Sequence, residues 1–193
     1  MSLWLAIAQA ALPVAVDGQA LPSLAPMLER TTLAVVNIAT RGQTKQRRQS
    51  PLYDDPFFQR FFNLPGTERI RETQSLGSGV IVDATNGYVL TNNHVIENAY
   101  EITVTLADGR EMLAEIIGRD PDTDVAVIQV KDSNLTQLPI ADSSRLRVGD
   151  FVVAIGNPFG LGQTVTSGIV SALGRSGLGI ESFEDFIQTD ASI

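Results

Sequence analysis

The chain has 193 residues, of which 44% are hydrophobic and 19% are charged, so it can bury a core as one large domain or two small ones. Its formal net charge of −8 gives no overall positive field, which argues against a nucleic acid or an anionic membrane as a general partner. The absence of cysteine excludes disulfides and thiolate sites, and the single histidine, His94, excludes a multi-histidine zinc site.

The first residues form an apolar run, residues 3–16, which is shorter than the roughly twenty residues that cross a bilayer. The run is typical of the hydrophobic region of a secretory signal, although residues 1–2 lack a basic side chain. A flexible arm of another origin is the alternative. We therefore expect residues 1–20 to form a signal-like or flexible segment, and we expect no integral membrane segment.

The following residues predict a helix, a strand and a long loop. Ser23 is a suitable N-cap for a short helix that ends at Glu29, and residues 33–40 have the composition of a strand. The polar, proline-containing residues 41–74 predict a long loop. Within it, four phenylalanines would lie on one face of a short helix. They are Phe57, Phe58, Phe61 and Phe62. Such a cluster either packs on the protein itself or contacts another subunit or a polypeptide substrate.

Next comes a predicted β-hairpin that carries the only histidine. Residues 79–83 are a short β-branched run, residues 88–91 are the return strand, and Asn86-Gly87 between them suits a type I′ turn. The second strand of this hairpin leads directly to His94. Any imidazole chemistry therefore has one location in this chain.

Further short strands follow, separated by turn residues rich in glycine, asparagine and aspartate. The run at residues 125–130 is apolar enough to be buried on both faces. Because no segment has a helical period long enough for a β-α-β unit, the pattern predicts an all-β barrel or sandwich. The predicted strands are residues 101–106, 110–117, 125–130, 151–155, 164–173 and 186–189.

Taken alone, His94 is either a structural residue or a general base. A histidine acts as a base in acyl transfer when a carboxylate orients its ring and stabilises the imidazolium. Asp124, at the start of the strand at residues 125–130, is one candidate for that carboxylate. Spacing does not separate it from Asp120, Asp122 or Asp132, and aspartates in turns also cap backbone N–H groups.

Five stretches of the sequence resemble the HtrA family of periplasmic serine proteases. The resemblance extends from about residue 21 to residue 193, and only residues 41–74 match poorly in detail. The motifs are GSGVIVDATNGYVLTNNHVI, DGRE, GRDPDTDVAVIQV, ADSSRLRVGDFVVAIGNPFGLGQTVTSGIVSALGRSG and FIQTDASI.

This resemblance implies an all-β, chymotrypsin-like fold of two antiparallel β-barrels. Residues 21–145 would form the first barrel, with residues 41–74 as its long loop, and residues 146–193 would begin the second barrel, which is incomplete here. The resemblance also implies that His94 is the general base and Asp124 the carboxylate that orients it.

In the family, the motif that ends this chain leads into a glycine-flanked serine, which is the nucleophile. The 193 residues do not contain that serine, and we therefore expect the chain alone to be inactive. Four serines are possible substitutes, but none lies at a glycine-flanked elbow, since Ser78, although it has a glycine on each side, lies within a predicted strand. They are Ser78, Ser167, Ser176 and Ser192.

The resemblance further implies a role in protein quality control in the bacterial periplasm. Misfolded polypeptides would be the substrates, no metal or organic cofactor would take part, and the protein would form homotrimers or larger cages of trimers. Residues 41–74 would contact neighbouring subunits. Two alternatives to an active protease are a non-catalytic fragment and a chaperone-like binder that holds unfolded chains through its phenylalanine cluster.

Overall fold

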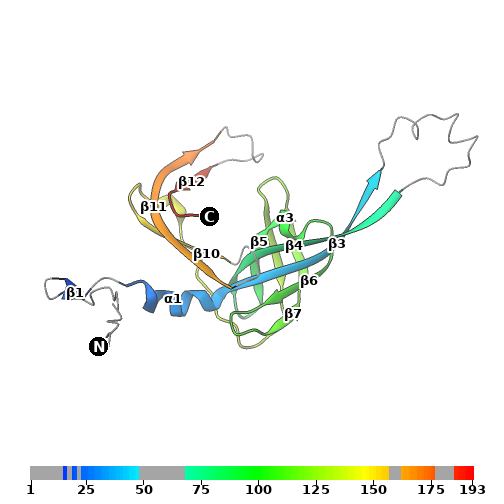
Figure 1. Cartoon of the computed structure of the whole chain (residues 1–193), viewed down its shortest axis with the longest axis horizontal. Helices are drawn as coiled ribbons and strands as arrows, with labels where there is room; N and C mark the ends of the chain where they lie inside the picture. Colours follow the sequence, from blue (N-terminus) through cyan, green and yellow to red (C-terminus); the bar gives the residue numbers. More distant parts are fainter. Residues whose placement is uncertain (1–14, 17–18, 21–22, 48–67, 157–161, 177–184) are drawn as a thin grey trace, which may run out of the picture.

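A computed structural model describes residues 15–16, 19–20, 23–47, 68–156, 162–176 and 185–193. Nearly all of its regular elements are strands, and every strand pair is antiparallel (Figure 1). The all-β architecture predicted from the sequence is therefore confirmed. No helix among these residues is long and apolar enough to cross a membrane.

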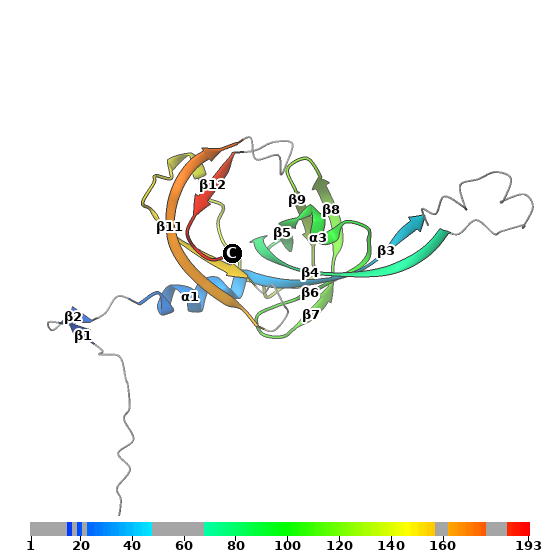
Figure 2. The same ribbon diagram turned by 45° about the horizontal axis from the view of Figure 1, so that its top comes forward.

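The larger sheet has seven strands in the order β7-β6-β3-β4-β5-β9-β8, and it curls into an open barrel (Figures 1 and 2). A short helix and a 3₁₀ turn precede it, and a four-residue helix follows β5. The elements are α1 (Ala25–Thr31), η1 (Thr32–Ala34), β3 (Val35–Arg47), β4 (Glu68–Asp83), β5 (Tyr88–Asn92), α3 (Asn93–Ile96), β6 (Ala99–Thr105), β7 (Glu111–Leu113), β8 (Glu115–Asp120) and β9 (Val125–Gln129).

The smaller sheet consists of β10 (Phe151–Gly156), β11 (Thr164–Arg175) and β12 (Phe186–Thr189), in that order. A 3₁₀ turn, η2 (Ser143–Arg145), precedes it, and a separate pair, β1 (Ala15–Val16) and β2 (Gln19–Ala20), lies near the N-terminus. In both ribbon views the C-terminus lies on the concave side of the smaller sheet, which is the side that faces the larger sheet (Figure 2).

The core lies inside the larger sheet and follows the two-residue period of its strands. In β9, for example, Ala126 and Ile128 are buried, whereas Val125 is 41% exposed. Full burial of such an aliphatic side chain contributes about 1.5–3 kcal/mol. The buried apolar cluster comprises Val36, Ile38, Ile81, Val89, Val95, Ile96, Ile102, Val104, Leu106, Ala126, Ile128 and Val130.

The prediction of a long loop over residues 41–74 is wrong at both ends. β3 and β4 continue as a paired ribbon that runs from Val35 opposite Val80 to Arg47 opposite Glu68. Strand pairing satisfies the backbone groups whatever the polarity of the side chains. The remaining residues, 48–67, include the phenylalanine cluster and lie outside the described residues, as do residues 1–14.

The first hairpin is present, but its predicted type I′ turn is wrong. Four residues, 84–87, connect β4 to β5, and only Gly87 has a left-handed φ, of +70°. The Asp83 carboxylate determines this geometry, because it accepts hydrogen bonds from the backbone N–H groups of Thr85 and Asn86 and from the Asn86 side chain.

Four smaller differences from the predicted elements have local causes. The helix begins at Ala25 with Leu24 as its N-cap and ends at Thr31, although the Ser23 hydroxyl accepts a bond from the Ala25 N–H. The strand predicted at residues 33–40 begins at residue 35 because residues 32–34 form a 3₁₀ turn.

The strand at 110–117 divides into β7 and β8 at Ala114, whose N–H donates to the Ile102 carbonyl. Residues 125–130 are not buried on both faces, because only one face of β9 meets the core.

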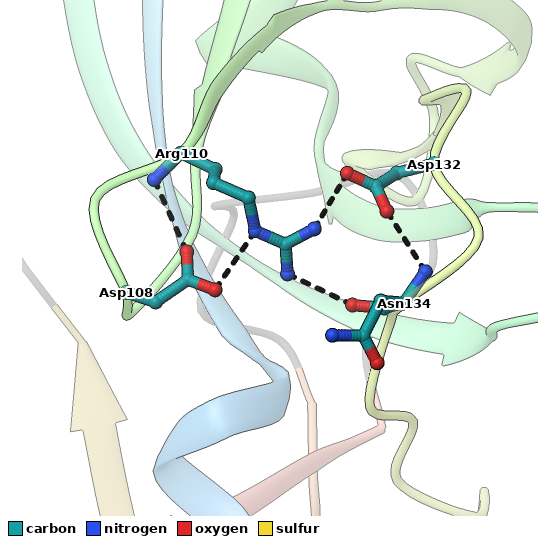
Figure 3. Close-up of polar contacts among 4 residues, drawn as sticks. All are labelled: Asp108, Arg110, Asp132 and Asn134. Atoms are coloured by element: carbon teal, nitrogen blue, oxygen red, sulfur yellow. Dashed lines mark hydrogen bonds and ion pairs between the residues drawn. The ribbon is translucent and has the colours of Figure 1, made fainter.

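A charged network joins the β6–β7 turn to the segment after β9 (Figure 3). Arg110 donates from Nε to the Asp108 carboxylate at 2.8 Å and from a terminal nitrogen to the Asp132 carboxylate at 2.6 Å. Its other terminal nitrogen donates to the backbone oxygen of Asn134 at 2.8 Å. The planar guanidinium therefore holds two separate segments in a fixed relation.

After β12 the chain turns back along β11. The Asp190 carboxylate accepts a bond from the Ile169 N–H at 2.8 Å, and the Thr166 hydroxyl donates to the Ser192 carbonyl at 2.6 Å. Gly168 allows this close approach, since a Cβ there would overlap with Asp190 and Ala191. The last residues are thereby fixed against the smaller sheet.

Candidate active site

His94 lies on α3, a single helical turn in which the residues before and after the histidine are buried. Its neighbours Asn93, Val95 and Ile96 are buried, whereas 66% of the His94 side chain is exposed. Gly77 of β4 makes room for Val95, because a Cβ at residue 77 would overlap with the valine side chain. The turn is thus anchored by apolar packing and presents the imidazole to solvent.

Asp124 lies directly before β9 and faces this histidine. Its carboxylate accepts a hydrogen bond from His94 Nδ1 at 2.7 Å through Oδ2, and from the His94 backbone N–H at 2.8 Å through Oδ1. An ionised carboxylate only accepts hydrogen bonds, so Nδ1 carries the ring proton and Nε2 is left as the proton acceptor of the neutral ring. This arrangement is chemically able to accept and return a proton at Nε2.

The backbone at Asp124 is unusual, with a φ of +52° in the left-handed region. The Asn93 N–H donates to the Asp124 carbonyl at 3.1 Å, and the Asn92 side-chain amide donates to the same carbonyl at 3.2 Å. The strained residue is therefore fixed by contacts from the end of β5 and the start of α3.

Burial is the largest single influence on the ionisation of Asp124, and it disfavours the charged form. The hydrogen bonds from the His94 backbone and ring and from the Asn92 amide outweigh it, so the pKa of Asp124 lies below its ordinary value. Only 18% of the side chain is exposed, which limits the competition from water for these bonds.

Two of the three other acidic residues that spacing left open are engaged elsewhere, and the third, Asp122, is exposed. Asp120 accepts from the Asp122 N–H and the Thr123 hydroxyl within its own turn, and Asp132 pairs with Arg110. Of the four candidate aspartates, it is Asp124 that contacts His94. No group of three or more His, Cys, Asp or Glu side chains suited to a metal ion occurs among the residues that the structure describes.

The contact that sequence reasoning missed is that of Asn92, whose amide also donates to the Asp124 carboxylate at 3.1 Å. An asparagine directly before a short helix normally indicates a local N-cap. Here its amide is directed instead to a residue thirty-two positions away, which local sequence rules do not reveal.

Residues 77–193 match the family of the trypsin-like peptidase domain. The chain is 55% identical over 96% of its length to the periplasmic pH-dependent serine endoprotease DegQ of Escherichia coli, and 49% identical over 93% of its length to the periplasmic serine endoprotease DegP of Salmonella typhimurium. It spans only 41% and 42% of the length of these two proteins.

The solved structures of similar proteins include a variant of the HtrA-type protease AlgW with a decapeptide. It superposes with a TM-score of 0.76 at 48% identity, over 89% of this chain and 52% of that one. The seven-stranded open barrel and the three-stranded sheet therefore correspond to a trypsin-like fold whose second barrel is incomplete here. The chain belongs to the family of trypsin-like peptidase domains, and over most of its length it is a homologue of the HtrA-type proteases DegQ and DegP that covers the N-terminal part of their protease domain.

Proposed function

We propose that this chain is the N-terminal part of a serine endopeptidase of HtrA type, with His94 as its general base and Asp124 as the carboxylate that orients the base. The observation that supports this proposal is the double hydrogen bond of the Asp124 carboxylate to the ring and backbone of His94, at 2.7 and 2.8 Å. Homology to serine endoproteases is the second support.

In the proposed mechanism, His94 Nε2 takes the proton from a serine hydroxyl as that oxygen attacks the scissile carbonyl. The imidazolium then returns the proton to the leaving amine. Asp124 keeps the Nδ1–H tautomer in place and stabilises the positive charge that forms on the ring between these steps. These steps use no metal or organic cofactor.

We further propose that the nucleophilic serine follows Ile193 in a longer protein. The chain spans about two fifths of the length of these two relatives, so most of each relative has no counterpart in the 193 residues. The C-terminus lies on the side of the smaller sheet that faces the larger one, from which a continuing chain could approach α3 (Figure 1).

The proposed substrates are misfolded polypeptides of the periplasm, since the relatives are named periplasmic endoproteases. By the same resemblance, we propose a homotrimer or a larger cage of trimers. Residues 48–67, which carry the phenylalanine cluster, would contribute to those contacts.

The test compares the longer protein with its variants, using cleavage of an unfolded protein and labelling by a fluorophosphonate, which reacts with activated serines. We expect H94A to lower kcat by about 10⁶. Glu97, exposed at the other end of α3, provides the control E97A, which should keep kcat within about twofold of the parent.

Two outcomes would contradict the proposal. Retention of peptidase activity in H94A would show that His94 is not the general base. Labelling of the 193-residue chain itself would show that the nucleophile does not lie beyond Ile193. If the longer protein cleaves nothing but suppresses aggregation of a denatured client, the chaperone-like alternative replaces the peptidase.

A further inference from the structure

One amide group contacts both the main chain and the side chain of Asp124. Asn92 Nδ2 lies 3.1 Å from the carboxylate oxygen Oδ2 and 3.2 Å from the carbonyl oxygen of the same residue. A primary amide has two hydrogens, so it can donate one to each oxygen at once. This pair of bonds limits how the carboxylate can turn relative to its own backbone.

The location of Asn92 shows that this contact replaces an ordinary local role. Asn92 is the last residue of β5, opposite Val125 in the β5–β9 pair, and it is the N-cap residue of α3. An asparagine at an N-cap usually accepts a bond from an N–H of the first helical turn, yet its side chain makes no such bond here. The Asp124 carboxylate accepts from the His94 N–H instead, so Asn92 Oδ1 is not needed as a cap acceptor, and Asn92 Nδ2 donates to Asp124.

The chemistry of the donor suits the proton transfer. Oδ2 is the atom that accepts from His94 Nδ1, and the same atom accepts from Asn92. An amide is neutral, so it fixes the oxygen without cancelling the negative charge that would stabilise an imidazolium. A lysine or arginine at that place would provide donors but would also oppose a positive charge on the ring.

We propose that Asn92 is a positioning residue, which holds the Asp124 carboxylate in register with His94 Nδ1 by donating to both its Oδ2 and its carbonyl oxygen. This inference rests on the function proposed above for His94 and Asp124. Asn92 does not touch the reacting atoms, and it acts through Asp124.

The variants are N92A, which removes the amide, and N92D, which keeps its shape but replaces the donor by a second carboxylate. The chain provides a matched control, because Asn86 Nδ2 donates to Asp83 Oδ2 at 2.7 Å in the exposed β4–β5 turn. N86A therefore removes the same kind of amide–carboxylate bond away from His94.

The first readout is the Nδ1–H proton of His94 in NMR spectra of the 193-residue chain, which is free of overlap because the protein has one histidine. We expect its exchange with water to accelerate on the order of tenfold in N92A and more in N92D, because the carboxylate that shields it is no longer held. N86A should leave it unchanged. An exchange rate in N92A or N92D equal to that of N86A would overturn the proposal.

The second readout is kinetic and uses the longer protein. N92A should lower kcat about tenfold while KM stays within about twofold, because orientation of the base is lost and substrate contacts are kept. A kcat equal to that of N86A would overturn the proposal. If H94A retains activity, the proposed peptidase mechanism fails, whereas the NMR comparison still decides whether Asn92 positions the Asp124–His94 pair.

Discussion

Asp124 accepts two hydrogen bonds from His94, one from the ring and one from the backbone of the same residue. The backbone bond ties α3 to the segment that precedes β9, and the ring bond selects the tautomer with the proton on Nδ1. One carboxylate therefore contributes both to the local fold and to the proposed chemistry. Changes at Asp124 should consequently affect both activity and stability, and the two effects can be separated by measurement.

Replacement of Asp124 by Asn should lower kcat of the longer protein by about 10³–10⁴, because the amide can hold the ring in the wrong tautomer and carries no charge. The measurement is steady-state cleavage of an unfolded protein. Asp122 lies exposed in the same turn, so D122N is the control and should change kcat by less than about twofold. A D124N enzyme with at least a tenth of the parent activity would contradict the role of Asp124.

The lowered pKa of Asp124 predicts a pH-dependent contribution to stability. Because the pKa is lower in the folded than in the unfolded chain, the contribution is complete above the unfolded value of about 3.9 and is lost as pH falls through the folded value. D124N should therefore reduce the free energy of unfolding by about 1–2 kcal/mol near neutral pH.

The measurement is urea unfolding of the parent chain and D124N between about pH 7 and about pH 3. The difference in free energy between the two proteins should shrink as pH falls below the unfolded pKa. A difference that stays constant over this range would show that the ionisation of Asp124 is not coupled to folding. D122N should follow the parent chain throughout.

Much of the fold could be predicted because the strands alternate with a period of two and end at clear turn residues. The polar ribbon at residues 41–47 and 68–74 could not, because its pairing depends on backbone groups that any side chain permits. The turn after Asp83 was predicted but its type was not, since the Asp83 carboxylate decides the geometry by accepting from the Asn86 N–H. The division between residues 145 and 146 stays a prediction.

The site was only partly predictable from the residues themselves. His94 was identifiable as the sole histidine, but its partner depends on the β5–β9 register, which aligns Asn92 with Val125 and so brings Asp124 beside α3. His94 and Asp124 are thirty positions apart in the sequence, and this spacing does not reveal the register of β5 and β9. Resemblance to a family indicated Asp124, and the contact from Asn92 required the structure.

Arg110 should stabilise the larger sheet through its planar geometry as well as its charge. R110K keeps the charge but cannot contact Asp108, Asp132 and the Asn134 carbonyl together, so we expect a lower temperature of thermal unfolding. The loss should become smaller at high salt, which screens the exposed pairs in the parent chain. Calorimetry at low and high salt measures both effects. An unfolding temperature equal to that of the parent in R110K would contradict a role for the fork geometry.

Gly87 connects the hairpin that leads to His94 with the end of β9, and it should not tolerate a side chain. Its φ is +70°, and a Cβ there would overlap with the Val130 carbonyl oxygen, whereas Gly109 has a φ of +87° with open space around its Cβ position. We expect G109A to cost about 1 kcal/mol from backbone strain alone and G87A about 3 kcal/mol, because overlap with backbone adds to the strain. Urea unfolding of both variants measures the difference. Equal losses in the two variants would show that the hairpin tip moves away from Val130 without cost, and the close contact between residues 87 and 130 would then contribute nothing to stability.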